Sequence, residues 1–108
     1  MSEEVLDLTP ITDPAVSLLA GHPRGVAARQ ELGVDHLDAV AEVVKLVVPS
    51  TVNAITPSFV QGFFGNSAVK LKTKDRVVEH YDVLALPEGI KQDILVGLDR
   101  LFHQNRLP

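Results

Sequence analysis

The sequence contains no cysteine and no tryptophan, and aromatic residues fill only 5% of its 108 positions. Without cysteine, the chain cannot form a disulfide scaffold, a thiolate metal site or a cysteine nucleophile, and it fits a reducing compartment. With so few aromatic residues, the core must be built from aliphatic side chains. These are plentiful, because hydrophobic residues reach 45% of a chain that is long enough to bury a core unaided.

Long apolar runs and basic leader segments are also missing. No stretch approaches the length of uncharged apolar sequence that a membrane-spanning helix needs, so we expect no membrane partner. The first residues, MSEEVLDL, carry no basic segment and no long apolar run, which argues against a secretory signal and predicts a cytoplasmic protein. The formal net charge of −4 argues against nucleic-acid binding over the whole surface.

Strand-like and helix-like segments alternate along one continuous domain, residues 1–108. The run Val43–Val48 is apolar on both faces, which predicts a central strand covered on both sides. Strands that alternate with helices predict a small layered α/β domain with a mixed sheet and helices packed on it. The expected order is strand, helix, helix, strand, helix, strand and helix, at about residues 3–10, 13–21, 21–33, 43–48, 56–66, 76–86 and 87–108.

Capping residues and glycines set the expected ends of the helices. Asp13 and Pro14 suit the N-cap and the first position of a helix that Gly21 would end, and Gly33 would end the next one. The last helix is the clearest, because an apolar stripe follows its period. That stripe consists of Ile90, Ile94, Leu95, Leu98, Leu101 and Phe102.

The segment 67–86 is ambiguous. Its alternation fits a hairpin with a turn near TKDR, and it also fits a loop or helix end followed by one strand; in both cases we expect a strand at 76–86. An extended chain would place a basic row on one side, as a candidate contact for phosphates of a nucleic acid or nucleotide. The alternative is an edge strand that lysines protect from wrong pairing. The row consists of Lys70, Lys72, Lys74 and Arg76.

The stretch AITPSFVQGFFG predicts the start of a helix that carries a serine. Thr56 is the expected N-cap, with Pro57 at the first helical position and Ser58 at the second. Phe63 and Phe64 are adjacent and point in different directions, so both cannot easily face one core. We expect Phe64 in an exposed contact patch, and burial under a loop is the alternative.

Catalytic and metal-binding signals are weak. Ser58 as a nucleophile would need a base such as His36 or His80, and no G-x-S-x-G motif surrounds it, so we expect no enzyme. The histidines show no H-x-x-x-H spacing, so we expect neither a metal nor another cofactor. They are His22, His36, His80 and His103.

The segments PRGVAARQEL, VVKLVV and AITPSFVQGFFG, in this order, resemble the STAS-like domains of unknown function. In that family an Arg-Gly-containing helix precedes an apolar strand, and a Ser-Phe pair opens the next helix. An acidic residue that the family strand often carries before this helix is missing from VNAIT. The matching residues are Arg24, Gly25, Arg29, Ser58, Phe59 and Gly65.

The wider STAS fold includes anti-sigma-factor antagonists, which bind a kinase-like partner and are switched by phosphorylation at the strand-to-helix junction. The resemblance therefore implies a protein partner, such as an ATPase or a kinase-like regulator, and phosphorylation of Ser58 or, next to it, Thr56. A dianionic phosphate suits a helix N-terminus. The plainer alternative is that both hydroxyls only satisfy free N–H groups at the helix end.

Together these observations predict a non-catalytic, regulatory protein-binding module. We expect its contact surface to contain Thr56, Ser58 and Phe64, with Arg24 nearby if the resemblance holds. Three alternatives stay open: a nucleic-acid or nucleotide-binding module that uses the basic row, a small serine hydrolase, and a structural homo-oligomer.

Overall fold

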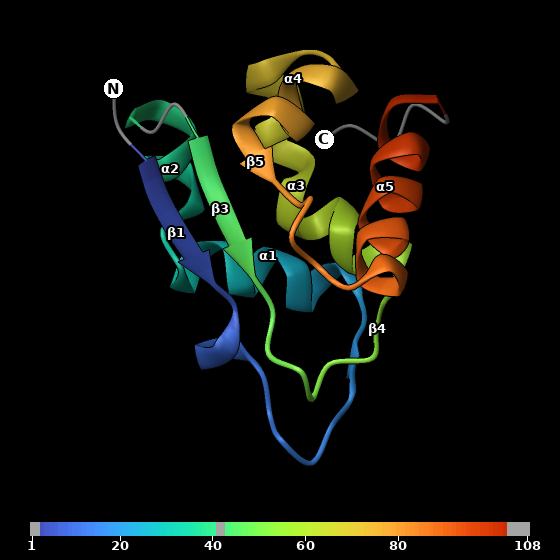
Figure 1. Cartoon of the computed structure of the whole chain (residues 1–108). Helices are drawn as coiled ribbons and strands as arrows, with labels where there is room; N and C mark the ends of the chain where they lie inside the picture. The colour runs from blue at the N-terminus through green and yellow to red at the C-terminus, as the bar shows by residue number, and fades with distance from the viewer. Residues whose placement is uncertain (1–2, 41–42, 104–108) are drawn as a thin grey trace.

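The β-branched run forms the central strand of a three-stranded sheet, as predicted. The computed structural model of the chain describes residues 3–40 and 43–103. In it, strand β3 (Val43–Val47) lies between β1 (Glu3–Asp7) and β5 (Tyr81–Asp82), and both pairs run parallel. The predicted small layered α/β domain is confirmed (Figure 1).

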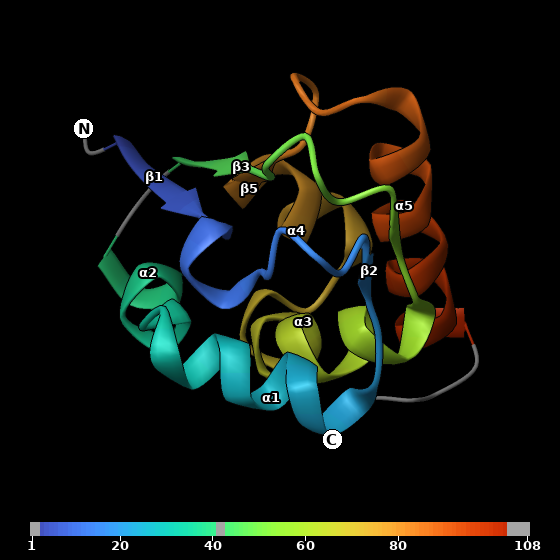
Figure 2. The same cartoon turned by 90° about the horizontal axis from the view of Figure 1, so that it is seen from below.

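A second, shorter parallel pair brings two helix starts together. Strand β2 (Leu18–Leu19) pairs with β4 (Ala54–Ile55), and each leads directly into a helix. These helices are α1 (His22–Glu31) and α3 (Pro57–Leu71). Because the two strands run parallel, α1 and α3 begin at the same end of the molecule (Figure 2).

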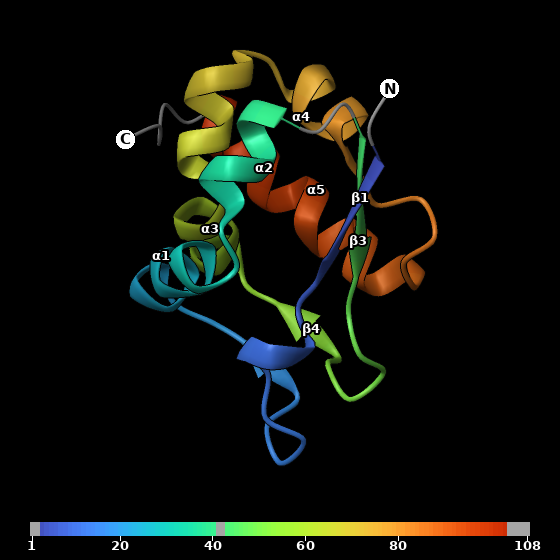
Figure 3. The same ribbon diagram turned by 90° about the vertical axis from the view of Figure 1, so that its left-hand side faces the viewer.

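The helices gather on one face of the larger sheet. Figure 3 shows β1 and β3 on one side of the molecule, and the helices on the other side or beyond them. The remaining elements are η1 (Thr9–Ile11), α2 (Val34–Val40), α4 (Lys74–His80) and α5 (Glu88–His103). Within residues 3–40 and 43–103, no helix has the length and apolarity that a membrane crossing requires.

The two faces of the sheet differ in burial. Leu6, Val44 and Leu46 are buried against the helices, whereas Val5 and Lys45, which alternate with them, are exposed. The prediction that the central strand is covered on both sides is therefore wrong for the outward face. One lysine within the apolar run marks the solvent side.

Helix α3 lies at the centre of the core and packs against both α1 and α5. Its contact with α1 is made through glycines: a Cβ added at Gly62 would lie 2.2 Å from the backbone oxygen of His22, and one at Gly25 would lie 2.2 Å from that of Phe59. The two backbones thus cross in direct contact. All three phenylalanines of AITPSFVQGFFG, as well as Tyr81, belong to the core.

The predicted helix at 13–21 is wrong. The Asp13 Oδ1 accepts a hydrogen bond from the Ala15 N–H at 2.9 Å, and an isolated antiparallel bridge joins Asp13 to Val16. The aspartate therefore caps a local turn, which such side chains stabilise as readily as a helix start. The chain then continues into β2.

The predicted strand at 76–86 is wrong for most of its length, because residues 76–80 are helical and residues 83–86 form a turn. Thr73 caps α4 by accepting the Arg76 N–H at 3.1 Å, Val77 turns into the core, and only Tyr81 and Asp82 are extended. Helix α3 also runs past the expected stop near residue 65 and ends at Lys72, whose φ of 76° is left-handed. Alternating apolar residues over so short a segment fit a helix face as well as a strand.

Two predicted helix boundaries and the predicted apolar stripe of the last helix are confirmed. Thr56 is the N-cap of α3, with Pro57 as its first residue, and α1 ends just before Gly33, which has a φ of 67°. In α5 the predicted stripe faces the core, where its members Ile90, Ile94, Leu98 and Leu101 are buried.

Candidate functional site

The start of α3 carries two hydroxyl groups next to the start of α1. Thr56 Oγ1 accepts the Phe59 N–H at 3.3 Å and the Gly21 N–H at 3.4 Å, and it lies 3.1 Å from Ser58 Oγ. Gly21 precedes α1 without a side-chain cap. Two positively polarised helix ends therefore meet beside a half-buried serine, which is an environment that favours an anion.

A groove opens between α1, η1 and the start of α3. It has a volume of about 320 Å³. Its walls combine apolar side chains with charges of both signs. Arg24 and Phe59 both line it, so Arg24 lies at the same end of the molecule as Ser58, which precedes Phe59 in the chain. The lining residues are Pro10, Ile11, Thr12, Asp13, Leu19, Arg24, Ala27, Ala28, Glu31 and Phe59.

Phe64 does not belong to this surface. It is 3% exposed and lies edge-on to Phe63 and Tyr81, with ring centroids 4.9 and 5.2 Å away. Phe59 and Phe63 stack at 5.7 Å. Both rings face a space that Leu46 of the sheet and Ile94 of α5 also line, so the two adjacent phenylalanines share one core. The prediction that Phe64 lies in an exposed contact patch is wrong.

The predicted basic row is not formed. Lys70 points to Asp35 and Asp38 at 3.5 and 3.6 Å, and Lys74 Nζ lies 2.5 Å from Asp99 Oδ1. Lys72 is the left-handed C-cap of α3, and Arg76 lies on α4. The four side chains therefore do not line one side of an extended segment, and two of them are paired with carboxylates.

The histidines named as bases for Ser58 have other surroundings. His80 Nε2 lies 2.9 Å from the Leu37 carbonyl oxygen, and its ring packs on Tyr81. His36 is exposed on α2. Among the described residues, no hydrogen bond joins either ring to Ser58, and no group of three or more histidine, aspartate or glutamate side chains is arranged to hold a metal ion.

The most extensive polar cluster was not predicted. Arg29 is 3% exposed, and its Nη1 donates to the Phe63 carbonyl oxygen at 2.9 Å and to Ser67 Oγ at 2.7 Å. Its Nε donates to Asp35 Oδ1 at 3.1 Å, and its Nη2 forms ion pairs with Asp35 and Asp38. One guanidinium group thus joins α1, α2 and α3.

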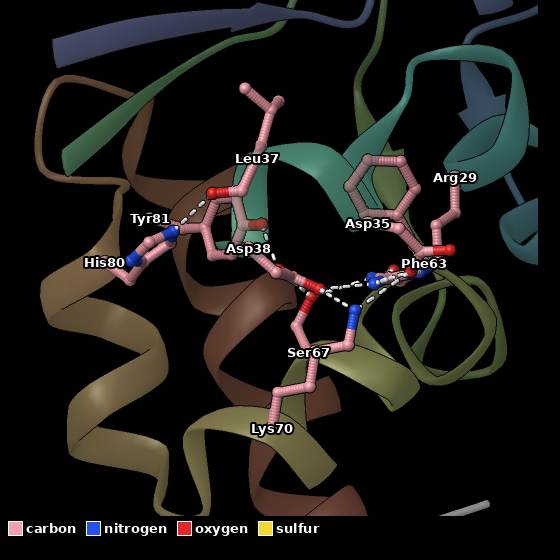
Figure 4. Close-up of polar contacts among 9 residues, drawn as sticks. All are labelled: Arg29, Asp35, Leu37, Asp38, Phe63, Ser67, Lys70, His80 and Tyr81. Carbon is pink, nitrogen blue, oxygen red and sulfur yellow. Dashed lines mark hydrogen bonds and ion pairs between the residues drawn. The ribbon is translucent and has the colours of Figure 1, made fainter. Parts of the chain in front are cut away.

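Asp38 is the second centre of this cluster (Figure 4). Its side chain is 0% exposed and accepts hydrogen bonds from Ser67 Oγ at 2.7 Å, from Arg29 and from the Tyr81 hydroxyl. Tyr81 adds β5 to the three helices. We call Arg29, Asp38, Ser67 and Tyr81 the buried polar cluster.

Two groups in or beside the buried polar cluster have shifted pKa values. Burial, with the hydrogen bond to the Asp38 carboxylate, raises the pKa of Tyr81, so its hydroxyl stays a donor. The hydrogen bonds and charge of Arg29 lower the pKa of Asp35. Every buried side-chain nitrogen and oxygen of the described residues has a partner. The cluster therefore ties its helices to one another and to β5.

The resemblance contained one hint of this cluster, because Arg29 is among its matching residues. Asp38, Ser67 and Tyr81 lie on other elements, and nothing in their spacing along the sequence predicts that they meet. Comparisons with protein-family models, curated proteins and solved structures found no match for this chain. The resemblance to STAS-like domains therefore stays a prediction.

Proposed function

We propose that this chain is a non-catalytic, regulatory protein-binding module of the STAS-like kind. Its contact surface is the groove between α1, η1 and the start of α3, together with Thr56 and Ser58 beside it. The observation that carries this proposal is the groove itself, which opens between the exposed Arg24 and the start of α3, where the serine lies.

The shape and lining of the groove suit a segment of another protein. A volume of about 320 Å³ is at the small end of ligand pockets and accommodates one or two side chains. The partly exposed Ile11 offers apolar contact above the buried Leu19 and Phe59, and Arg24 and Glu31 supply opposite charges for a polar rim. This combination of an apolar centre and a charged rim is typical of protein interfaces.

Reversing the charge of Arg24 and enlarging Ala27 should remove binding. Both residues are exposed and line the groove, so Arg24→Glu with Ala27→Glu changes charge and shape without touching the core. We expect the partner's affinity to fall at least about tenfold, which corresponds to about 1.4 kcal/mol. The measurement is quantitative mass spectrometry of proteins retained by the tagged chain from its own cells, at two salt concentrations.

Arg100→Glu with Gln92→Glu is the matched control, because both residues are exposed on α5 and neither lines the groove. It should retain the wild-type set of proteins at both salt concentrations. If the groove variant and the control retain the same proteins, the groove is not the contact surface.

Phosphorylation of Ser58 is the proposed switch of this surface, with Thr56 as the second candidate. The helix ends beside Ser58 favour an added negative charge, while a partner that accepts the neutral hydroxyl would reject it. We expect Ser58→Glu to lower the affinity for the partner about tenfold or more, and Ser58→Ala to leave this affinity unchanged. Equal retention by both variants would exclude a charge switch at this position.

A further inference from the structure

The outward face of the larger sheet is left uncovered by this chain. The residues on this face alternate with the buried ones, and Val5, Lys45 and Asp82 form one row across the three strands. In the next row Asp7 lies opposite Val47. Figures 1 and 3 show no helix in front of β1 and β3 on this side.

Large apolar side chains are exposed on this face and in the loop that follows β5. Val5 is 60% exposed, and Leu84, two residues after Asp82 in the loop that follows β5, is 73% exposed. They are the two most exposed large hydrophobic side chains of the described residues. Parallel sheets are covered on both faces in nearly all proteins, so a bare face of this kind indicates that something else covers it.

The charges on this face are arranged to complement a second copy of it. Lys45 is the cation of the central strand, and the carboxylates of Asp7 and Asp82 lie on the two flanking strands. Among the described residues, Lys45 forms no ion pair. A two-fold axis parallel to the strands and placed between β3 and β5 brings each Lys45 opposite Asp82 of the other copy.

We propose that the outward face, defined by Val5, Asp7, Lys45, Asp82 and Leu84, is the interface of a symmetric homodimer. Val5 and Leu84 supply the apolar contact, and Lys45 of each copy pairs with carboxylates of the other. This interface does not depend on the groove between α1 and η1. The proposal is therefore independent of the proposed function.

The size of the face sets the expected strength of the dimer. Three strands about 4.8 Å apart, two of five residues and one of two, at about 3.3 Å per residue, cover far less than the roughly 800 Å² per partner of a standard interface. The loop that carries Leu84 enlarges the contact only modestly. We therefore expect a dissociation constant of about 10 μM to 1 mM, in the range of weak and transient interfaces.

Sedimentation equilibrium of the full chain from about 10 μM to 2 mM tests this interface, since that range brackets the expected dissociation constant. The wild type should pass from monomer to dimer as the concentration rises. Lys45→Glu places a like charge beside Asp7 and Asp82 of both copies, and Leu84→Asp removes apolar contact. Each variant should weaken association at least about tenfold, with unchanged circular dichroism.

Lys72→Glu is the control for Lys45→Glu, because it makes the same charge change at an exposed position at the end of α3, outside this face. It should dimerise as the wild type does. A wild-type chain that stays monomeric at the highest concentration overturns the proposal. So does a dimer that Lys45→Glu and Leu84→Asp leave as strong as the control.

Discussion

Replacement of Arg29 by methionine is expected to lower the free energy of unfolding by about 3–5 kcal/mol. Methionine fills much of the volume of the arginine side chain but makes none of its hydrogen bonds. The Asp38 carboxylate, which is fully buried, then loses its ion pair with Arg29 and keeps only the longer contact with Lys70 at 3.6 Å, and the Phe63 carbonyl loses its side-chain donor. A buried charge that loses its main partner costs far more than the pair contributes.

Urea unfolding followed by circular dichroism measures this effect, with Arg24→Met as the matched control. Arg24 lies on the same helix but is exposed and has no role in the buried polar cluster, so its replacement should change stability by less than about 0.5 kcal/mol. Equal losses for the two variants would contradict the assigned role of Arg29.

A second substitution separates the unpaired charge from lost packing. Asp38→Asn in the Arg29→Met background removes the charge while its amide oxygen can still accept from Ser67 and Tyr81. The double variant should recover part of the unfolding free energy that Arg29→Met loses. Asp38→Asn alone should be less stable than the wild type, so we expect a coupling of about 1–3 kcal/mol between the two positions. Additive losses would show that the ion pair is not the source of the effect.

The buried polar cluster also bears on the proposed contact surface. Arg29 ties α1 to α2 and α3, and the side of α1 that carries Arg24, Ala27 and Glu31 lines the groove. The cluster therefore holds the groove in shape from behind. Arg29→Met should weaken partner binding indirectly, and for this reason the binding test uses exposed residues of the groove.

The sequence predicts those parts of the fold that depend on local chemistry. A β-branched run such as Val43–Val47 has few alternatives to a strand. The Thr56-Pro57 pair specifies a helix start, because Thr56 caps a free backbone N–H and Pro57 has no N–H that would need a partner. Helix α5 has a stripe that only a helical period explains. In these cases propensity, pattern and packing favour the same structure.

The errors occur where tertiary contacts choose between locally acceptable structures. Asp13 caps a turn as well as it would cap a helix. The apolar residues of 74–80 are spaced in a way that fits the period of a helix as well as the period of a strand. Phe64 is buried because β5 brings Tyr81 against it from a distant part of the chain. The partners of Arg29 likewise come from two other elements, α2 and α3. None of these contacts has a sequence spacing that could reveal it.

One methyl group added where α1 and α3 cross should also lower the free energy of unfolding strongly, as the loss of the Arg29 charge does in the buried polar cluster. In Gly62→Ala the new Cβ would lie 2.2 Å from the His22 carbonyl oxygen and 3.0 Å from the Val26 nitrogen. Both atoms belong to backbone, which cannot rotate away as a side chain does. The helices must separate, and this loosens the packing of α3 on α1 along its length.

Two effects of opposite sign decide how Gly62→Ala changes the free energy of unfolding. Alanine favours a helix over glycine by about 1 kcal/mol, whereas overpacking costs about 1–3 kcal/mol and more when backbone must move. We expect a net loss of about 2–3 kcal/mol for Gly62→Ala and a similar loss for Gly25→Ala, which meets the Phe59 carbonyl oxygen. Either loss is a large part of the stability of a typical domain.

Gly89→Ala on α5 provides the control, because a Cβ there meets no atom within 4 Å. It should leave stability unchanged or raise it by up to about 1 kcal/mol, since only the helix preference acts. Thermal unfolding of the three variants under one set of conditions compares them directly. If Gly62→Ala and Gly25→Ala are as stable as Gly89→Ala, α1 and α3 do not cross in backbone contact. The groove, whose walls include Arg24 of α1 and Phe59 of α3, would then have a different shape.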